Sequence, residues 1–286
     1  MTRLQRILST CGVALLMLLL ARPAFADGWP QRRGHGFYKI GFRMVRATHY
    51  YEPNGNRIGI PTLGDYTISF YSEYGLTGRI TAIAYVPFFE RITLNEQIGR
   101  NSGFVFSEGD AVTGIADPII GARVGLAQFG GTVVSASLRL GLPLGNDDQP
   151  NGLLTGDGEL NQLVSLEAGH SFYPRPAYAS ASVGFNQRMK GFSDEIAYTL
   201  EAGYTIADRF TITARMRGVE PLRNGDPDVG GQRGLNGNDV RYLAYGAEFS
   251  YTHQGRYGLS LGFEGATRAQ NVLSGTALSV GLFLKT

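Results

Sequence analysis

Beyond residue 26, the chain consists of about twelve segments of roughly ten residues in which apolar and polar side chains alternate. The segment 195–206 is the clearest case. Its even-numbered positions, from Ile196 to Ile206, are apolar or aromatic, whereas Thr199 and Glu201 lie at odd-numbered positions. When apolar and polar residues alternate with a period of two, one face of a strand lies against an apolar phase and the other lies against water. The pattern predicts an all-β fold, a transmembrane antiparallel β-barrel of about twelve strands.

The connections between the segments are alternately tight and long. The long ones are rich in Gly, Asn, Asp and Pro, so they are expected to be external loops, with the tight turns and both chain ends in the periplasm. Tyr and Phe residues near both ends of the strands are typical of interfacial girdles. A soluble β-sandwich shares the alternation but not these girdles. The expected strands are 36–47, 65–75, 79–89, 115–126, 132–143, 161–172, 177–188, 195–206, 209–218, 240–252, 256–266 and 276–285.

The N-terminus predicts export. Residues 1–26 combine a basic start, an apolar run from Cys11 to Ala21 and a small-x-small site that ends at Ala26, which is the pattern of a cleaved signal peptide. A membrane anchor is the alternative, but the run is short for a span and an arginine and a proline follow it. We therefore expect residues 27–286 to form a barrel in the outer membrane of a Gram-negative envelope.

Charge and cysteine content agree with this location. Removing the three arginines of the signal leaves 23 basic residues against 24 acidic ones, so the mature chain has no global field for nucleic acid. The single cysteine, Cys11, leaves with the signal, and the mature chain needs neither a disulfide nor a thiol. The expected partners are membrane lipid and lipopolysaccharide, a small-molecule solute and the barrel assembly machinery.

The phase of the alternation assigns charged side chains to the inner face, because a charge facing lipid costs a few kcal/mol. The wall from Arg79 to Arg139 is predicted to be basic and the later half mostly acidic. The facing charges either brace a narrow interior by salt bridges or line a path whose field orients a solute; both can hold. The candidate lumen-lining residues are Lys39, Arg43, Glu73, Arg123, Arg139, Glu167, Glu201, Arg215, Glu248 and Glu264, and the same face takes in Arg79, Arg188, Glu195, Arg209 and Arg217.

The search for catalytic chemistry is mostly negative. The four histidines have no ligand spacing for a metal. Outer-membrane phospholipases carry a Ser two residues after a His, but His170 is followed at that offset by Phe172. We expect no enzyme activity, no catalytic or metal-binding residue and no cofactor. The acidic segments 157–159 and 224–228 suit either Ca²⁺ binding, including contacts with the divalent ions of lipopolysaccharide, or simple solvation.

Several short glycine-based motifs point to a family. They are Thr113–Pro118, Arg139–Gly145, Thr155–Gly158 and His170–Tyr173. Over roughly residues 64–220 this series resembles the transporters of the MetA phenol-degradation pathway family. The resemblance implies a membrane barrel related to the fatty-acid-transporter-like channels, which take up small, often aromatic or hydrophobic, molecules. It carries over no binding residue.

Two functions follow from these observations. The first is a passive outer-membrane channel for a small solute. The alternative is a structural or adhesive surface protein whose lumen is closed by salt bridges and whose loops 90–114 and 219–239 carry the interaction. Channel conductance separates the two.

Overall fold

The structure, a computed structural model, describes residues 28–229 and 237–286. The expected signal peptide, residues 1–26, lies outside the described residues. The strands are β1 (Gly36–Tyr51), β2 (Arg57–Gly75), β3 (Ile80–Leu94), β4 (Gln97–Ile98), β5 (Val105–Ser107), β6 (Asp110–Gly114), β7 (Ile119–Phe129), β8 (Thr132–Gly141), β9 (Asn161–Ser171), β10 (Ala177–Gln187), β11 (Glu195–Ile206), β12 (Phe210–Pro221), β13 (Arg241–His253), β14 (Tyr257–Gln270), β15 (Val272–Ser274) and β16 (Ala277–Lys285).

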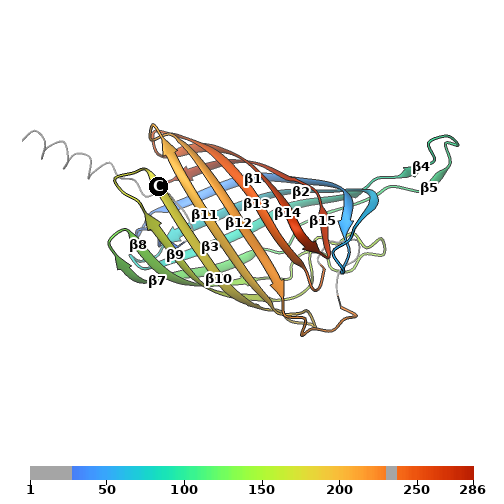
Figure 1. The fold of residues 1–286 in the computed structure, drawn as a ribbon, viewed down its shortest axis with the longest axis horizontal. Coiled ribbons are helices and arrows are strands. Elements are labelled where there is room, and N and C mark those ends of the chain that lie inside the picture. Colours follow the sequence, from blue (N-terminus) through green and yellow to red (C-terminus); the bar gives the residue numbers. More distant parts are fainter. Residues whose placement is uncertain (1–27, 230–236) are drawn as a thin grey trace, which may run out of the picture.

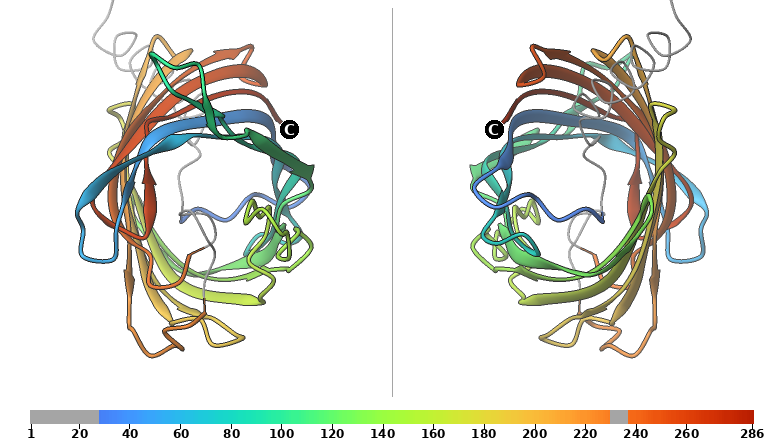
Figure 2. Two further views of the ribbon diagram at one scale, coloured as in Figure 1. Left: turned by 90° about the vertical axis from the view of Figure 1, so that its right-hand side faces the viewer. Right: turned by 90° about the vertical axis from the view of Figure 1, so that its left-hand side faces the viewer.

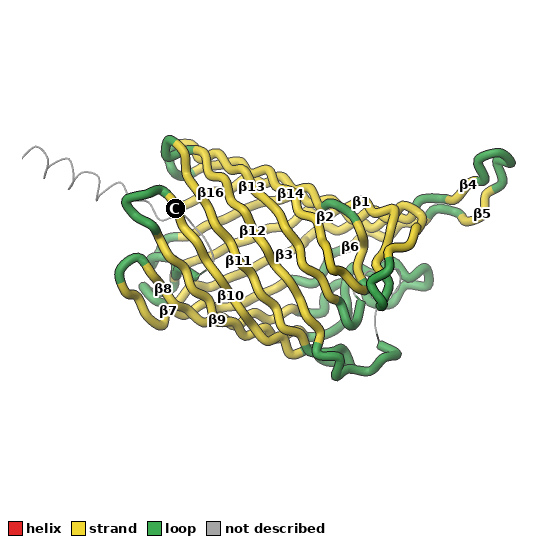
Figure 3. The backbone as a smooth tube through the Cα atoms, in the orientation of Figure 1, coloured by secondary structure: helices red, strands yellow, loops and turns green. Residues whose placement is uncertain are grey.

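Twelve long strands form a closed antiparallel barrel (Figures 1 and 3): β1, β2, β3, β7 to β14 and β16. Each of these long strands pairs with the next long strand along the chain. The short strand β6 also pairs with β3, and the short strand β15 also pairs with β1. Strand β1 pairs with β2 on one side and β16 on the other, so the ring has no open edge. The expected all-β barrel of twelve strands is confirmed. No helix long and apolar enough to cross a membrane occurs among the described residues.

Short turns join the strands at one end of the barrel, which we call the turn end. Ala207 and Asp208 have φ angles of 51° and 55°, and Gln254 and Gly255 have 48° and 67°. Two successive positive φ angles give the tight hairpin that matches the twist of the flanking strands. Thr286 lies at the same end and donates its backbone N–H to Gly36 at 2.9 Å.

The opposite end, the loop end, differs most from the expected strand boundaries. Strand β3 continues to Leu94 and pairs there with β6, so part of the expected loop 90–114 is sheet. The hairpin of β4 and β5 projects beyond the barrel (Figure 1). A register shift between β2 and β3 places two residues of β3 opposite Ser69, which reverses the alternation and turns Glu90 to the same face as its partner Thr67.

The outward face of the wall is apolar. On β11 the exposed side chains are Leu200, Tyr204 and Ile206, while Glu201 between them is buried on the inside. Exposed rings gather at the turn end, where Tyr74, Phe129, Phe172, Tyr173, Phe210 and Tyr257 lie. Tyr178 was expected in the girdle at the turn end, but it is only 6% exposed and points inward. An apolar exterior around a polar interior is the surface that a bilayer requires.

Candidate functional site: the barrel interior

Residues 28–35, the N-terminal segment, run inside the barrel at the turn end. Figure 2 shows this segment in blue, crossing the space within the ring of strands. Gly28 accepts a hydrogen bond from Ser135 Oγ of β8 at 2.6 Å. Gln31 donates its backbone N–H to Thr81 Oγ1 of β3 at 2.7 Å and its side chain to Glu73 Oε2 of β2 at 2.8 Å. The segment is therefore fixed to β2, β3 and β8, on one side of the ring, and narrows the bore.

Trp29 anchors the N-terminal segment on the wall between these polar contacts. Its ring lies directly over Gly169 of β9, where a Cβ atom would collide with it. The ring also meets Tyr178 of β10 edge to face, with centroids 6.2 Å apart. Glycine at position 169 is thus required for the tryptophan to sit against the strand. Tyr178 lies on the same inward face of β10 as Ser180, and there its ring packs against Trp29.

Arg123 of β7 is the centre of a buried ion network beneath the segment, and its side chain is fully buried. Its Nε donates to Glu167 Oε2 at 2.6 Å and its Nη1 to Glu73 Oε1 at 3.1 Å. Nη1 also lies 3.4 Å from the carbonyl oxygen of Trp29. Glu167 accepts further bonds from Arg139 Nη2 at 2.9 Å and from a serine of β8. Two arginines and two glutamates therefore neutralise each other and connect the wall to the N-terminal segment.

The charges do not form the facing basic and acidic walls that we expected. Arg123, Arg139 and Glu167 lie on consecutive strands and pair with one another. Glu201 likewise pairs with Arg215 on the adjacent strand at 2.5 Å. Side chains opposite each other on neighbouring strands are about 5 Å apart, and a buried charge without a close partner is costly, so local pairing wins over pairing across the bore.

Lys39 of β1 and Glu248 of β13 do pair over a longer range, with Lys39 Nζ 2.7 Å from Glu248 Oε2. Strands β14 and β16 lie between them, so this ion pair reaches across two strands of the inner wall. Arg217 Nη2 reaches across β13 to Glu264 Oε1 of β14 at 2.5 Å.

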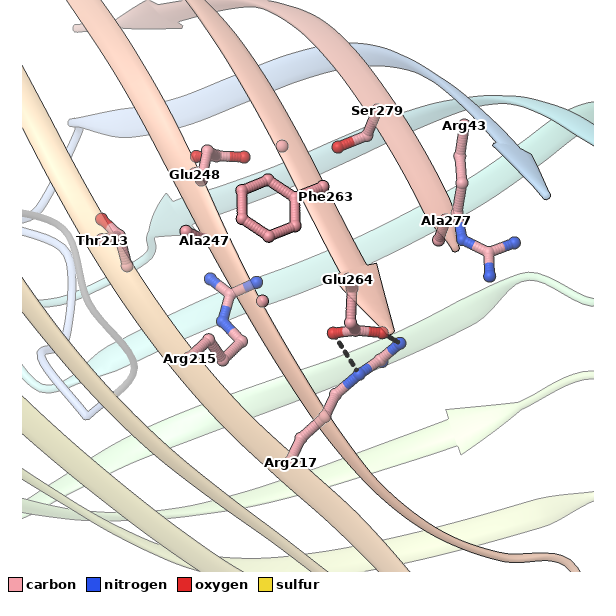
Figure 4. Close-up of a pocket in the computed structure, with 12 residues that line it drawn as sticks. Arg43, Thr213, Arg215, Arg217, Ala247, Glu248, Phe263, Glu264, Ala277 and Ser279 are labelled. Carbon is pink, nitrogen blue, oxygen red and sulfur yellow. Dashed lines mark hydrogen bonds and ion pairs between the residues drawn. The ribbon is translucent and has the colours of Figure 1, made fainter. Parts of the chain in front are cut away.

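Toward the loop end, three arginines border a cavity of about 180 Å³ (Figure 4). The side chains of Arg43, Arg215 and Arg217 are 41%, 45% and 43% exposed. Their carboxylate partners are 16%, 4% and 21% exposed in the same order: Asp65, Glu201 and Glu264. In these three pairs the guanidinium group is the more exposed partner. Glu248 also lines the cavity, 31% exposed and paired with Lys39, which is 23% exposed. The cavity therefore presents three well-exposed guanidinium groups and one carboxylate of intermediate exposure.

The segment 142–160 folds into the barrel at the loop end. Leu153 is fully buried among Leu63 and Ile92. The carboxylate of Asp117 accepts the backbone N–H of Gly145 at 2.7 Å and that of residue 157 at 2.9 Å. Burial raises the pKa of Asp117, and these two hydrogen bonds oppose the rise. The segment therefore narrows the mouth of the barrel at the loop end and is fixed to the wall.

Arg188, the residue directly after β10, holds the neighbouring loops together. It pairs with Asp157 at 3.2 Å, with Glu195 at 3.0 Å and with Glu159, and its guanidinium lies 4.3 Å from the ring centroid of Phe192. Burial raises the pKa of Glu159, and the charge of Arg188 lowers it. Asp157 and Glu159, which were weighed as calcium ligands, are thus used as ion-pair partners of an arginine.

In the part of the chain that the structure describes, no group of three or more His, Cys, Asp or Glu side chains is placed to hold a metal ion. His170 Nδ1 lies 2.8 Å from Thr132 Oγ1, and its ring packs edge to face on Phe172. This histidine occupies a structural contact at the turn end.

The fold has close counterparts among solved structures. It superposes on the COG4313 outer membrane channel from Pseudomonas putida F1 with a TM-score of 0.69 and 12% identity, covering 93% of this chain and 100% of that one. The NanC porin matches with a TM-score of 0.55 and 7% identity, covering 88% of this chain and 100% of that one. No protein-family model matches the sequence, and no curated protein sequence matches it. At these identities the likeness establishes the barrel fold.

Proposed function

We propose that this chain is an outer-membrane channel for the passive uptake of a small solute. The observation that carries the proposal is a closed barrel with an apolar exterior and a polar interior whose arginines border a water-accessible cavity. The similarity to an outer membrane channel and a porin supports the same reading. In this orientation the turn end and both termini face the periplasm, and the loop end faces outward.

The solute is small because two segments narrow the bore. The N-terminal segment crosses it at the turn end, and the segment 142–160 fills part of the loop end. The resemblance to the MetA phenol-degradation transporters supports an aromatic or hydrophobic molecule as the solute. Membrane lipid and lipopolysaccharide are the proposed partners of the exterior, and the barrel assembly machinery is the proposed partner during insertion.

Liposome swelling tests this function. The mature chain, reconstituted into liposomes, is expected to accelerate swelling in small neutral or anionic solutes of the size of benzoate or a monosaccharide. It should leave swelling in larger sugars close to that of empty liposomes, because the N-terminal segment remains in place. A protein that shifts its mobility on heating, as folded barrels do, and yet permits no swelling in any of these solutes would rule the channel out.

The alternative is a structural or adhesive surface protein. The ion pairs of the interior and the exposed rings of Phe104 and Phe106, 63% and 68% exposed on the projecting hairpin, favour it. Such a protein would permit no liposome swelling and show no channel conductance. The cavity beside Arg217 favours the channel.

A further inference from the structure

The cavity between Arg43, Arg215 and Arg217 has the features of a binding site. Figure 4 shows the two arginines of β12 and Arg43 of β1 around it. Small residues on β13, β14 and β16, among them Gly246 and Gly262, make up part of its floor, and Glu248 and Glu264 line it as well. These two glycines leave room above the sheet that a side chain would occupy.

The glycines of the floor are also fixed by packing. A Cβ atom at Gly246 would lie 2.6 Å from the carbonyl oxygen of Phe263, and one at Gly262 would lie 2.7 Å from Ser279 Oγ. Both distances are shorter than a carbon atom tolerates without a shift of its neighbours. Packing therefore disfavours larger side chains at these two positions of the floor.

The charges around the cavity are oriented. In all three ion pairs the cation is the more exposed partner, by 41% to 16%, 45% to 4% and 43% to 21%. Each carboxylate holds its guanidinium group by an ion pair. A solute in the cavity thus meets the positive ends of three fixed dipoles.

The arginines also retain hydrogen-bond donors for a ligand. Arg217 uses Nε and Nη2 in its bidentate contact with Glu264, and Arg43 uses Nη1 in its contact with Asp65. A guanidinium has five N–H donors, so most of the donors of these two side chains lie outside those ion pairs. Arginine forks bind carboxylates with two parallel hydrogen bonds, which adds both energy and orientation.

We propose that this cavity binds the carboxylate group of a small organic anion. A single negative charge fits best, because each arginine is already paired with one carboxylate of the protein. The positive charge left for a ligand is therefore too small for a dianion. The volume of about 180 Å³ is below the range of sites for drug-sized ligands, which limits the occupant to a small acid. As an assignment of the transported solute, the inference rests on the proposed channel function; binding at the cavity does not.

Fluorine NMR on the folded protein in micelles tests the binding directly, without any need for conductance. The probe is 4-fluorobenzoate, and 4-fluorobenzyl alcohol is the uncharged control ligand of similar shape. The ¹⁹F line of the acid is expected to broaden on addition of protein beyond its width in micelles alone, and an excess of acetate should reverse the broadening. The alcohol should show no such reversible effect.

Variants then locate the site. Arg217→Gln and Arg43→Gln are each expected to weaken binding of the acid about tenfold, since each removes charge-assisted hydrogen bonds. Arg241→Gln is the matched control: Arg241 is 39% exposed and pairs with Glu220 at 2.5 Å, but it lies outside the cavity, and this variant should bind as the wild type does. Arg217→Lys keeps the charge and loses the fork, so it should bind with intermediate affinity.

Two results would overturn the inference. One is equal broadening of the acid and the alcohol, which would indicate partition into the micelle or an apolar site. The other is unchanged binding in Arg217→Gln and Arg43→Gln, both folded by the heat-shift assay. If the acid binds as predicted while liposomes do not swell, the site stands and the channel function fails; if liposomes swell and no acid binds, the reverse holds.

Discussion

Replacing Arg123 with methionine is expected to destabilise the barrel by about 3–5 kcal/mol, the range for breaking a buried ion pair by removing one partner. Arg123 is fully buried and holds Glu167 and Glu73, which are 1% and 8% exposed. Methionine fills much of the volume but leaves both carboxylates without their main cation. Urea unfolding of the refolded protein, followed by the fluorescence of Trp29, its single tryptophan, measures the loss.

Arg139→Met is the control for this substitution. Arg139 has a 22% exposed side chain and contacts Glu167 from the edge of the same network, so its loss should cost clearly less. Adding Glu167→Gln to Arg123→Met should recover part of the stability, because it removes a buried charge that has lost a partner. Equal losses for the two single variants would show that Arg123 is not the centre of the network.

Removal of the N-terminal segment is expected to widen the channel. A chain in which the signal peptide is joined directly to Arg33 lacks the contacts of Gly28, Trp29 and Gln31 with six strands of the wall. The twelve strands keep their ladders, so the barrel should still form. Liposomes with this variant should swell several-fold faster in a trisaccharide than liposomes with the wild type.

Point substitutions check that the effect comes from the segment. Trp29→Gly should increase swelling to a smaller degree, because the polar contacts of Gln31 remain. Trp29→Phe keeps a ring over Gly169 and should behave nearly as the wild type. Unchanged permeability of the truncated chain, with a normal heat-dependent mobility shift, would mean that the segment does not limit passage.

The period of two predicted the wall well because it records a physical requirement: lipid on one side and water on the other. Each of the twelve expected strands overlaps one of the twelve long strands, and the tight hairpin at Ala207 and Asp208 was also expected. The boundaries differ most at the loop end, where β2 begins at Arg57 and not at residue 65. The extra length of β3 was missed, because a register shift at Ser69 reverses the alternation and makes Glu90 look like an outward residue. Alternation alone carries no sign of such a bulge.

The interior was harder to predict than the wall. Sequence assigns a side chain to the inner face but not to a partner, so the charges of Arg139 and Glu201 were expected to face each other across the bore when each in fact pairs with a neighbouring strand. The N-terminal segment has no periodic pattern, so its position inside the barrel, with Trp29 against β9, could not be predicted from the sequence. Gly169 is the residue that could have indicated it, as a glycine in a strand often marks the close approach of another group.

Single-channel recording from the wild-type mature chain in a planar bilayer is the most direct test of the proposed channel. The account predicts reproducible unitary steps of small conductance, and a reversal potential under a salt gradient that indicates preference for anions, because the guanidinium groups of Arg43, Arg215 and Arg217 are more exposed than their carboxylate partners. Protein that is folded by its heat-dependent mobility and inserted in the bilayer, yet gives no steps, would contradict the account.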